Sequence, residues 1–140
     1  MLAASASDVG RAMWPRIAER TQLPWPEGEY LALSGQALAS GHSRRKYHRF
    51  HLRYQAILRT ANGTFAAYSK DVSRMGVGVL APRQLFPSDE IELLLPDKGW
   101  LKLTVRRCRR LAEGCYEIGT EFADGILMAG RYKELLYNAR

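Results

Sequence analysis

The stretch Phe50-His-Leu-Arg-Tyr-Gln-Ala-Ile-Leu-Arg59 decides the fold class of this sequence. Its apolar residues recur at every second position, which is the period of a strand with one buried face. The side chains expected to point inward are Phe50, Leu52, Tyr54, Ala56 and Leu58. Those expected on the outer face are His51, Arg53, Gln55, Ile57 and Arg59. The stretch leads into Asn62-Gly63, a strong signal for a tight hairpin turn, so we predict a half-buried strand and a hairpin.

Five further short strands follow this one at regular spacing. They are predicted at residues 64–69, 76–80, 90–95, 100–109 and 115–122. Glycine, proline and the Ala-Glu-Gly turn at 112–114 separate them. Six short strands with regular turns favour a mainly β fold, a small six-stranded antiparallel barrel.

The two ends of the chain differ from this pattern. Residues 1–43 contain short helix-like pieces broken by prolines, such as Pro24-Trp25-Pro26, and too few apolar residues for a core of their own. We interpret them as a partly helical N-terminal extension preceding the barrel domain at 44–140. Near the other end, Asp124 can cap a helix over about 124–139, whose apolar face plugs or flanks the barrel.

Positive charge is concentrated in one part of the chain. Of 21 basic residues, seven lie between Tyr30 and Lys70, where no acidic residue occurs, and the remaining 14 are balanced by 14 acidic ones. A local excess of this kind indicates an anion site rather than general solubility. The sequence has no apolar run long enough for a membrane span and no secretory signal, so we expect a cytoplasmic protein.

Two short motifs carry candidate binding chemistry. Arg44-Arg45-Lys46-Tyr47-His48-Arg49 precedes the first strand, and each arginine fork can bind phosphate, pair with a guanine edge or stack on a base. Asp71-Val-Ser73-Arg-Met-Gly76 lies in the turn after the second strand, where a carboxylate and a hydroxyl can read a base edge. Taken singly, the first also fits a solvated loop and the second an ordinary turn.

The two motifs together, in this order on a small barrel, resemble the PilZ domain family of receptors for cyclic di-GMP. The resemblance runs from about Arg44 to about Phe122 and includes the closing strand Tyr116-Glu-Ile-Gly-Thr-Glu-Phe122. Residues 1–43 lie outside it.

The resemblance implies a role for each motif residue. Arg45 and Arg49 would hold guanines and phosphates, Asp71 and Ser73 would read a guanine edge, and Gly76 would keep the turn open. Arg44 would add a stacking or phosphate contact, which favours an intercalated ligand dimer. The implied function is a receptor whose arginine-rich loop changes conformation on binding and signals to a protein partner or through self-association.

Other functions find less support in the sequence. No catalytic triad, paired carboxylates or phosphate loop can be argued from spacing, so we expect neither an enzyme nor a cofactor, and the histidines lack the neighbours of a metal site. A nucleic-acid-binding barrel and a ligand-independent PilZ-like protein adaptor remain alternatives. The arginines at 106, 107, 109 and 110 are interpreted as a solvated face, with a second anionic contact or a guarded edge as alternatives.

Overall fold

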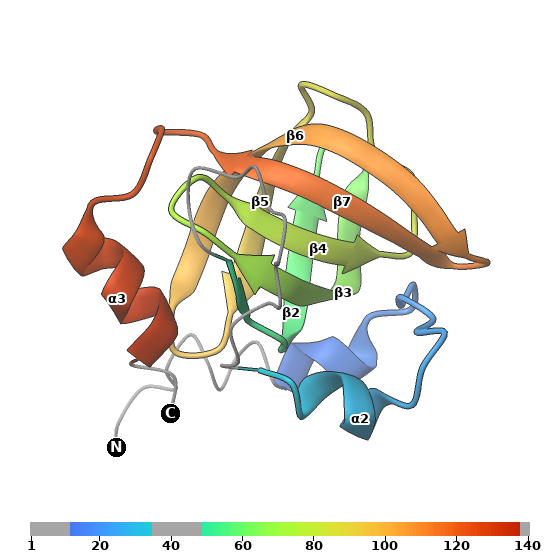
Figure 1. Cartoon of the computed structure of the whole chain (residues 1–140). Coiled ribbons are helices and arrows are strands. Elements are labelled where there is room, and N and C mark those ends of the chain that lie inside the picture. Colours follow the sequence, from blue (N-terminus) through green and yellow to red (C-terminus); the bar gives the residue numbers. More distant parts are fainter. Residues whose placement is uncertain (1–11, 35–48, 138–140) are drawn as a thin grey trace, which may run out of the picture.

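The computed structural model describes residues 12–34 and 49–137. Its helical elements are η1 (Trp14–Arg16), α2 (Glu27–Leu31) and α3 (Ala129–Tyr137). Its strands are β1 (Phe50–His51), β2 (Gln55–Thr60), β3 (Gly63–Val72), β4 (Val77–Ala81), β5 (Glu90–Leu95), β6 (Gly99–Ala112) and β7 (Cys115–Phe122) (Figure 1). The mainly β class predicted from the alternating pattern is confirmed.

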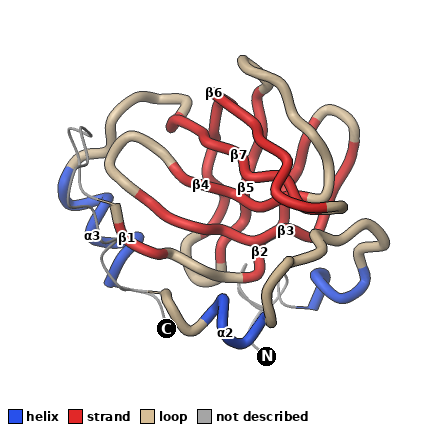
Figure 2. Tube along the Cα trace, turned by 45° about the vertical axis from the view of Figure 1, so that its right-hand side comes forward, coloured by secondary structure: helices blue, strands red, loops and turns tan. Residues whose placement is uncertain are grey.

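The described strands form a closed barrel. Six of them pair antiparallel in the order β3, β2, β5, β6, β7 and β4, and β4 then pairs with β3 to close the ring. The short strand β1 is an addition that pairs with the end of β3. In Figure 2 the helices lie at the periphery of the strands. The predicted six-stranded antiparallel barrel is therefore confirmed.

The C-terminal helix closes part of the barrel interior. Leu135 of α3 is 2% exposed and belongs to the same apolar cluster as the inward-facing residues of the strands. Leu127, Tyr132 and Leu136 pack against that cluster. In the described part of the chain, no helix has the length and apolar character to cross a membrane.

This helix begins later than the sequence suggested. The predicted start at Asp124 is wrong, because Gly125 adopts a positive φ of 92° and its N–H donates to the Phe122 carbonyl, which makes a turn. The backbone N–H of Leu127 is then used in a bond to Arg74. Helical geometry can start only after these bonds, and α3 begins at Ala129.

The predicted strand over 50–59 is interrupted at Leu52–Tyr54. The side chain of Ser69 on β3 fills the break, since its hydroxyl donates to the Leu52 carbonyl and accepts the Tyr54 N–H at 3.0 Å. The two pieces, β1 and β2, follow each other along β3. The alternation held for Leu52, Ala56 and Leu58, which are buried in the core, and for Tyr54, which packs against it, whereas Phe50 is only partly buried and belongs to neither core cluster. It could not reveal that a buried hydroxyl occupies the break, where backbone bonds from Leu52 to Lys70 and from Ser69 to Tyr54 still link the chain to β3.

The N-terminal segment, residues 14–34, covers part of the outer face of the barrel. Trp14 and Tyr30 are 8% and 2% exposed in a second apolar cluster that includes Ile57 of β2. The expectation that Ile57 faces solvent is thus wrong, because this segment lies over it. Trp14 also donates its indole N–H to the Ala67 carbonyl at 3.0 Å.

Candidate ligand-binding site

A row of four residues crosses the outer face of the barrel in register. Asp71 on β3 pairs with Gly78 on β4, Gly78 with Gly119 on β7, and Gly119 with Arg107 on β6. These residues alternate along their strands with interior side chains, so they face outward. The two central glycines leave bare backbone between a carboxylate and a guanidinium. The two glycines thus form a flat floor, with the carboxylate of Asp71 at one end and the guanidinium of Arg107 at the other.

Side chains at either end lean over the glycines. A Cβ at Gly78 would lie 2.5 Å from Oδ1 of Asp71, and a Cβ at Gly119 would lie 2.9 Å from Nε of Arg107. A larger residue at either position would displace the carboxylate of Asp71 or the guanidinium of Arg107. Neither glycine has a positive φ, so close approach is the constraint: it is strong at Gly78, beside the buried carboxylate of Asp71, and weak at Gly119, where the exposed side chain of Arg107 can move aside.

Asp71 connects the two sequence motifs. Its side chain is 2% exposed, and its Oδ1 lies 3.5 Å from Nη2 of Arg49, the last residue of the first motif. Lys70 adds a second cation 3.8 Å from Oδ2. A carboxylate this deeply buried requires such compensation. Within the described residues, Oδ1 accepts no hydrogen bond, so it retains acceptor capacity.

Lys70 and Glu117 extend the charged cluster toward β7. Lys70 occupies a bulge of β3 between Ser69 and Asp71, and its Nζ lies 2.8 Å from Oε2 of Glu117. Arg109 on β6 pairs with the other oxygen of Glu117 at 2.9 Å. Burial acts to raise the pKa of Glu117, but the bonds and charges of Lys70 and Arg109 outweigh it, and the pKa lies below its ordinary value.

This depressed pKa predicts an acid dependence of stability. A carboxyl with a lowered folded pKa stabilises the fold above its unfolded pKa, near 4.5, and that contribution disappears as the pH falls through the folded value. Glu117→Gln should therefore lower the free energy of unfolding by about 1 kcal/mol at pH 7 and by much less at pH 3. Urea denaturation at both pH values measures this. Glu121→Gln, which loses a more exposed pair with Arg106, is the control, and an equal loss at both pH values for Glu117→Gln would contradict the prediction.

The turn of the second motif is built from its own polar atoms. The N–H of Ser73 donates to the Gly76 carbonyl at 2.9 Å, and the Ser73 hydroxyl accepts the Met75 N–H at 3.1 Å. A Cβ at Gly76 would lie 1.8 Å from the Thr120 carbonyl oxygen, so only glycine fits against β7. Ser73 and Gly76 thereby fix the chain just beyond Asp71.

Arg74 holds this turn to the C-terminal part of the chain. Its Nε donates to the Leu127 carbonyl at 2.8 Å, and its own carbonyl accepts the Leu127 N–H at 2.8 Å. An arginine in a turn would ordinarily be interpreted as an exposed side chain without a role. In the structure, Arg74 instead anchors the turn to the chain that precedes α3.

The charged cluster surrounds a small surface hollow of about 110 Å³. Its lining residues are Arg49, Lys70, Asp71, Gly78, Arg107, Glu117, Ile118 and Gly119. Of the predicted site residues, Arg49 and Asp71 line it, while Ser73 and Gly76 lie in the adjoining turn. Arg44 and Arg45 lie outside the described residues.

Four residues that line this hollow were not predicted as site residues from the sequence. Gly78 and Gly119 looked like ordinary strand glycines, although a glycine at an outward position in each of two paired strands is a signal of close approach. Lys70 is displaced by a bulge that alternation does not reveal. Arg107 was assigned to a solvated face, with a second anionic contact or a guarded edge as alternatives; it is exposed, and the pairing of β6 with β7 places it at the hollow.

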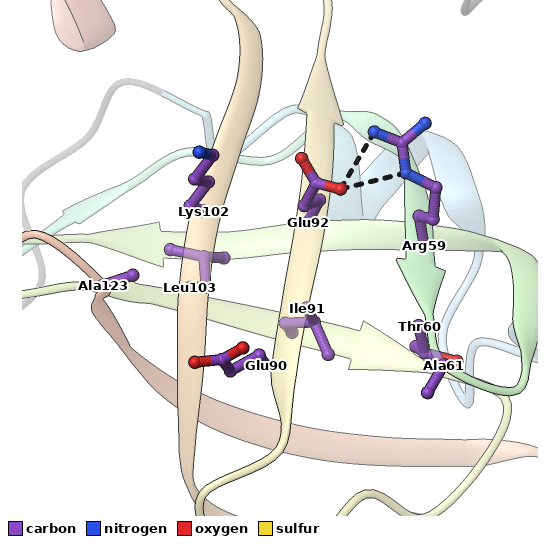
Figure 3. Close-up of a pocket in the computed structure, with 9 residues that line it drawn as sticks. All are labelled: Arg59, Thr60, Ala61, Glu90, Ile91, Glu92, Lys102, Leu103 and Ala123. Carbon is purple, nitrogen blue, oxygen red and sulfur yellow. Dashed lines mark hydrogen bonds and ion pairs between the residues drawn. The ribbon is translucent and has the colours of Figure 1, made fainter.

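A larger hollow lies elsewhere on the barrel. It measures about 680 Å³ and is lined by residues of β2, β5 and β6 and the loops beside them (Figure 3). Arg59 in this hollow is already paired with Glu92 at 2.9 Å, as the dashed lines of Figure 3 show. Neither sequence motif contributes a residue to it. Size therefore does not identify the candidate site, and the convergence of the two motifs does.

The fold and the site together define a small closed β-barrel with a hollow on its outer face that is lined by acidic and basic side chains. The model of the PilZ domain matches residues 43–136, about two thirds of the chain, and the chain belongs to this family. The resemblance suggested by the two motifs is thus confirmed at the level of the family.

Solved structures with a similar fold are distant in sequence. The Klebsiella pneumoniae MrkH–c-di-GMP complex has a TM-score of 0.50 at 21% identity, over 69% of this chain and 51% of that one. The PilZ domain of Escherichia coli YcgR with c-di-GMP has a TM-score of 0.49 at 18% identity, over 69% of this chain and 89% of that one. This chain therefore spans about half the length of MrkH. A search of curated proteins gave no match.

Proposed function

We propose that this protein is a non-enzymatic receptor for cyclic di-GMP, which binds over the hollow between β3, β4, β7 and β6. One observation carries the proposal: Arg49 of the first motif and Asp71 of the second lie 3.5 Å apart at the hollow. Membership of the PilZ family supports the same ligand, as do the solved family structures that contain it.

The chemistry of the site residues fits a guanine dinucleotide. Asp71 is an acceptor whose buried Oδ1 receives no hydrogen bond within the described residues, which suits the N–H edge of a guanine once the ligand reaches it. Arg45 and Arg49 would bind phosphate and guanine with their planar forks, and Ser73 would assist Asp71 at the base edge. Arg44 would add a stacking or phosphate contact and favour an intercalated ligand dimer.

Arg107 would add a further cation at the far end of the glycine floor. It is exposed, and its Nε is held beside Gly119, where an anionic group resting on the floor would meet it. Lys70 and Glu117 line the same hollow and set its local charge. The floor therefore offers an acceptor at one end and a donor at the other, a polarity that a guanine nucleotide matches.

The signal would leave the protein through conformation. Binding would change the conformation of the arginine-rich loop around Arg44, Arg45 and Arg49, and a protein partner or a second copy would recognise the result in the cytoplasm. Arg74 and Gly76 fix the opposite side of the site, so the loop is the side that would respond.

Isothermal titration with cyclic di-GMP tests the proposal and its stoichiometry. We expect binding by the wild type and roughly tenfold weaker binding by Arg107→Ala, since one charge-assisted bond from an exposed arginine is lost. Arg59→Ala is the matched control, because it removes an arginine paired across strands β2 and β5, away from the hollow. Equal losses in both variants would contradict a role for Arg107.

The same assay separates the alternatives. Tight, steeply salt-dependent binding of an oligonucleotide that free cyclic di-GMP does not displace would support a nucleic-acid-binding barrel instead. The absence of any binding by the wild type would support a protein adaptor. Two ligands bound per chain would support the intercalated dimer, and one per chain would contradict it.

A further inference from the structure

We infer that Tyr30, in the N-terminal segment, positions the Arg49–Asp71 site by holding the break between β1 and β2 through Ser69. The inference rests on the proposed function for its affinity test only. The N-terminal segment lies outside the residues that match the family, so this is a feature of the chain itself. Tyr30 is thus a positioning residue and need not touch the ligand.

The N-terminal segment is attached to the barrel through strand β3. The edge of β3 at Ala66 pairs with this segment, since Ala66 donates its N–H to the Glu19 carbonyl at 3.0 Å and accepts the Thr21 N–H at 2.9 Å. The Thr21 hydroxyl adds bonds to the carbonyls of Ala66 and Leu80. The segment is therefore bonded as an element of the fold and does not merely lie against it.

Tyr30 carries this attachment toward the site. Its hydroxyl donates to the Ser69 carbonyl at 2.7 Å, and its ring lies edge-on to Tyr68. The guanidinium carbon of Arg53 lies 4.3 Å from the centre of the Tyr30 ring, and the Trp25 ring stacks on the same Tyr30 ring. Burial raises the pKa of the Tyr30 hydroxyl, so the group remains a hydrogen-bond donor throughout the neutral range.

Ser69 is the junction between Tyr30 and the site. It is fully buried, its hydroxyl bridges Leu52 and Tyr54, and its backbone N–H donates to the Tyr54 carbonyl at 3.0 Å. Lys70 and Asp71 follow it directly in the chain. Ser69 thus fixes the chain that enters the site on β3 and the break that follows β1.

The β1 side needs this support because β1 is so short. It pairs with β3 through two residues, Phe50 and His51, and Arg49 immediately precedes them. Within the break itself, the N–H of Arg53 donates to the Ser34 hydroxyl at 3.0 Å, so the N-terminal segment contacts this stretch twice. A loosened break would let β1 separate from β3, and Arg49 would spend less time beside Asp71.

Tyr30→Phe tests the inference because it removes the hydroxyl and retains the ring. In the full-length chain, we expect faster hydrogen exchange at the amides of Leu52 and Tyr54, with no change at Leu93 in the barrel core. We also expect three- to tenfold weaker binding of cyclic di-GMP, the size of one net hydrogen bond. Titration should be done well below the unfolding temperature, so that global stability does not enter.

Thr21→Val is the matched control. It removes a buried hydroxyl from the same segment, whose bonds to Ala66 and Leu80 lie away from the break. It should cost similar stability and leave both the Leu52 and Tyr54 exchange and the affinity unchanged. Equal effects in the two variants would overturn the inference, because they would reflect general loosening of the segment.

The two readouts keep this inference separable from the proposed function. Unchanged exchange at Leu52 and Tyr54 in Tyr30→Phe would overturn the inference whatever the ligand proves to be. If exchange is faster in Tyr30→Phe but the wild type does not bind cyclic di-GMP, the structural role of Tyr30 is supported and cyclic di-GMP is excluded as the ligand. Faster exchange with unchanged affinity would overturn the link from the break to the site.

Discussion

Gly76→Ala is expected to lower the free energy of unfolding by roughly 3 kcal/mol, the upper end of the cost of overpacking a closely packed site. The added methyl group would lie 1.8 Å from the Thr120 carbonyl oxygen, which is backbone and cannot rotate away. Thr120 is itself held by Val77, whose carbonyl accepts the threonine hydroxyl at 2.7 Å. Relief would require β4 and β7 to separate. Urea denaturation measures the loss, and the displaced turn should also abolish cyclic di-GMP binding.

Gly130→Ala is the control for this variant. Gly130 lies in α3 with open space around its Cα, so alanine should be neutral or stabilise the helix by up to about 1 kcal/mol. A similar loss of stability in both variants would show that the response to added methyl groups is general. A Gly76→Ala protein of wild-type stability would contradict the packing argument.

Arg49→Ala should have the largest effect on the proposed activity, a roughly 100-fold loss of cyclic di-GMP affinity. The variant removes a fork expected to make more than one charge-assisted bond to the ligand. It should also cost about 2 kcal/mol of stability, because the carboxylate of Asp71 is left buried with Lys70 3.8 Å away as its compensating cation. Calorimetric titration and urea denaturation measure the two losses separately.

A second substitution separates stability from binding at this pair. Asp71→Asn removes the buried charge, so the double variant Arg49→Ala/Asp71→Asn should recover most of the stability lost in Arg49→Ala. It should not recover binding, because both proposed ligand contacts are altered. Recovery of binding in the double variant would mean that Arg49 acts only by neutralising Asp71. Additive stability losses would mean that the two residues do not interact.

Much of the fold could be predicted because its signals are local. Alternation gave the correct inward positions from Leu52 to Leu58, though not at the partly buried Phe50, and the turn at Asn62-Gly63 gave the first hairpin. The outer face at Ile57 could not be predicted, since it is covered by the N-terminal segment, residues 14–34, which is distant in sequence. The start of α3 was missed because Gly125 adopts a positive φ in a local turn, and the chain after it is bonded to the distant Arg74 through Leu127.

The candidate site divides along the same line. Motif spacing predicted Arg49, Asp71 and the turn after Asp71 as site residues, and the structure brings the first two together at one hollow. Arg107 and the two floor glycines depend on the register of three strand pairs, including a bulge, and no sequence spacing encodes that register. Most residues that face the barrel interior can thus be predicted from the sequence, whereas the side chains that meet on its outer surface depend on how the strands pair.

The bonds of Ala66 to Glu19 and Thr21 have a further consequence, for how this protein can be cut. A fragment trimmed to the family-matched residues would uncover a row of strand donors and acceptors together with the apolar side chain of Ile57. Exposed strand edges beside apolar surface recruit other chains into sheets. Self-association of such a fragment would therefore be an artefact of its boundary, not a property of the whole chain.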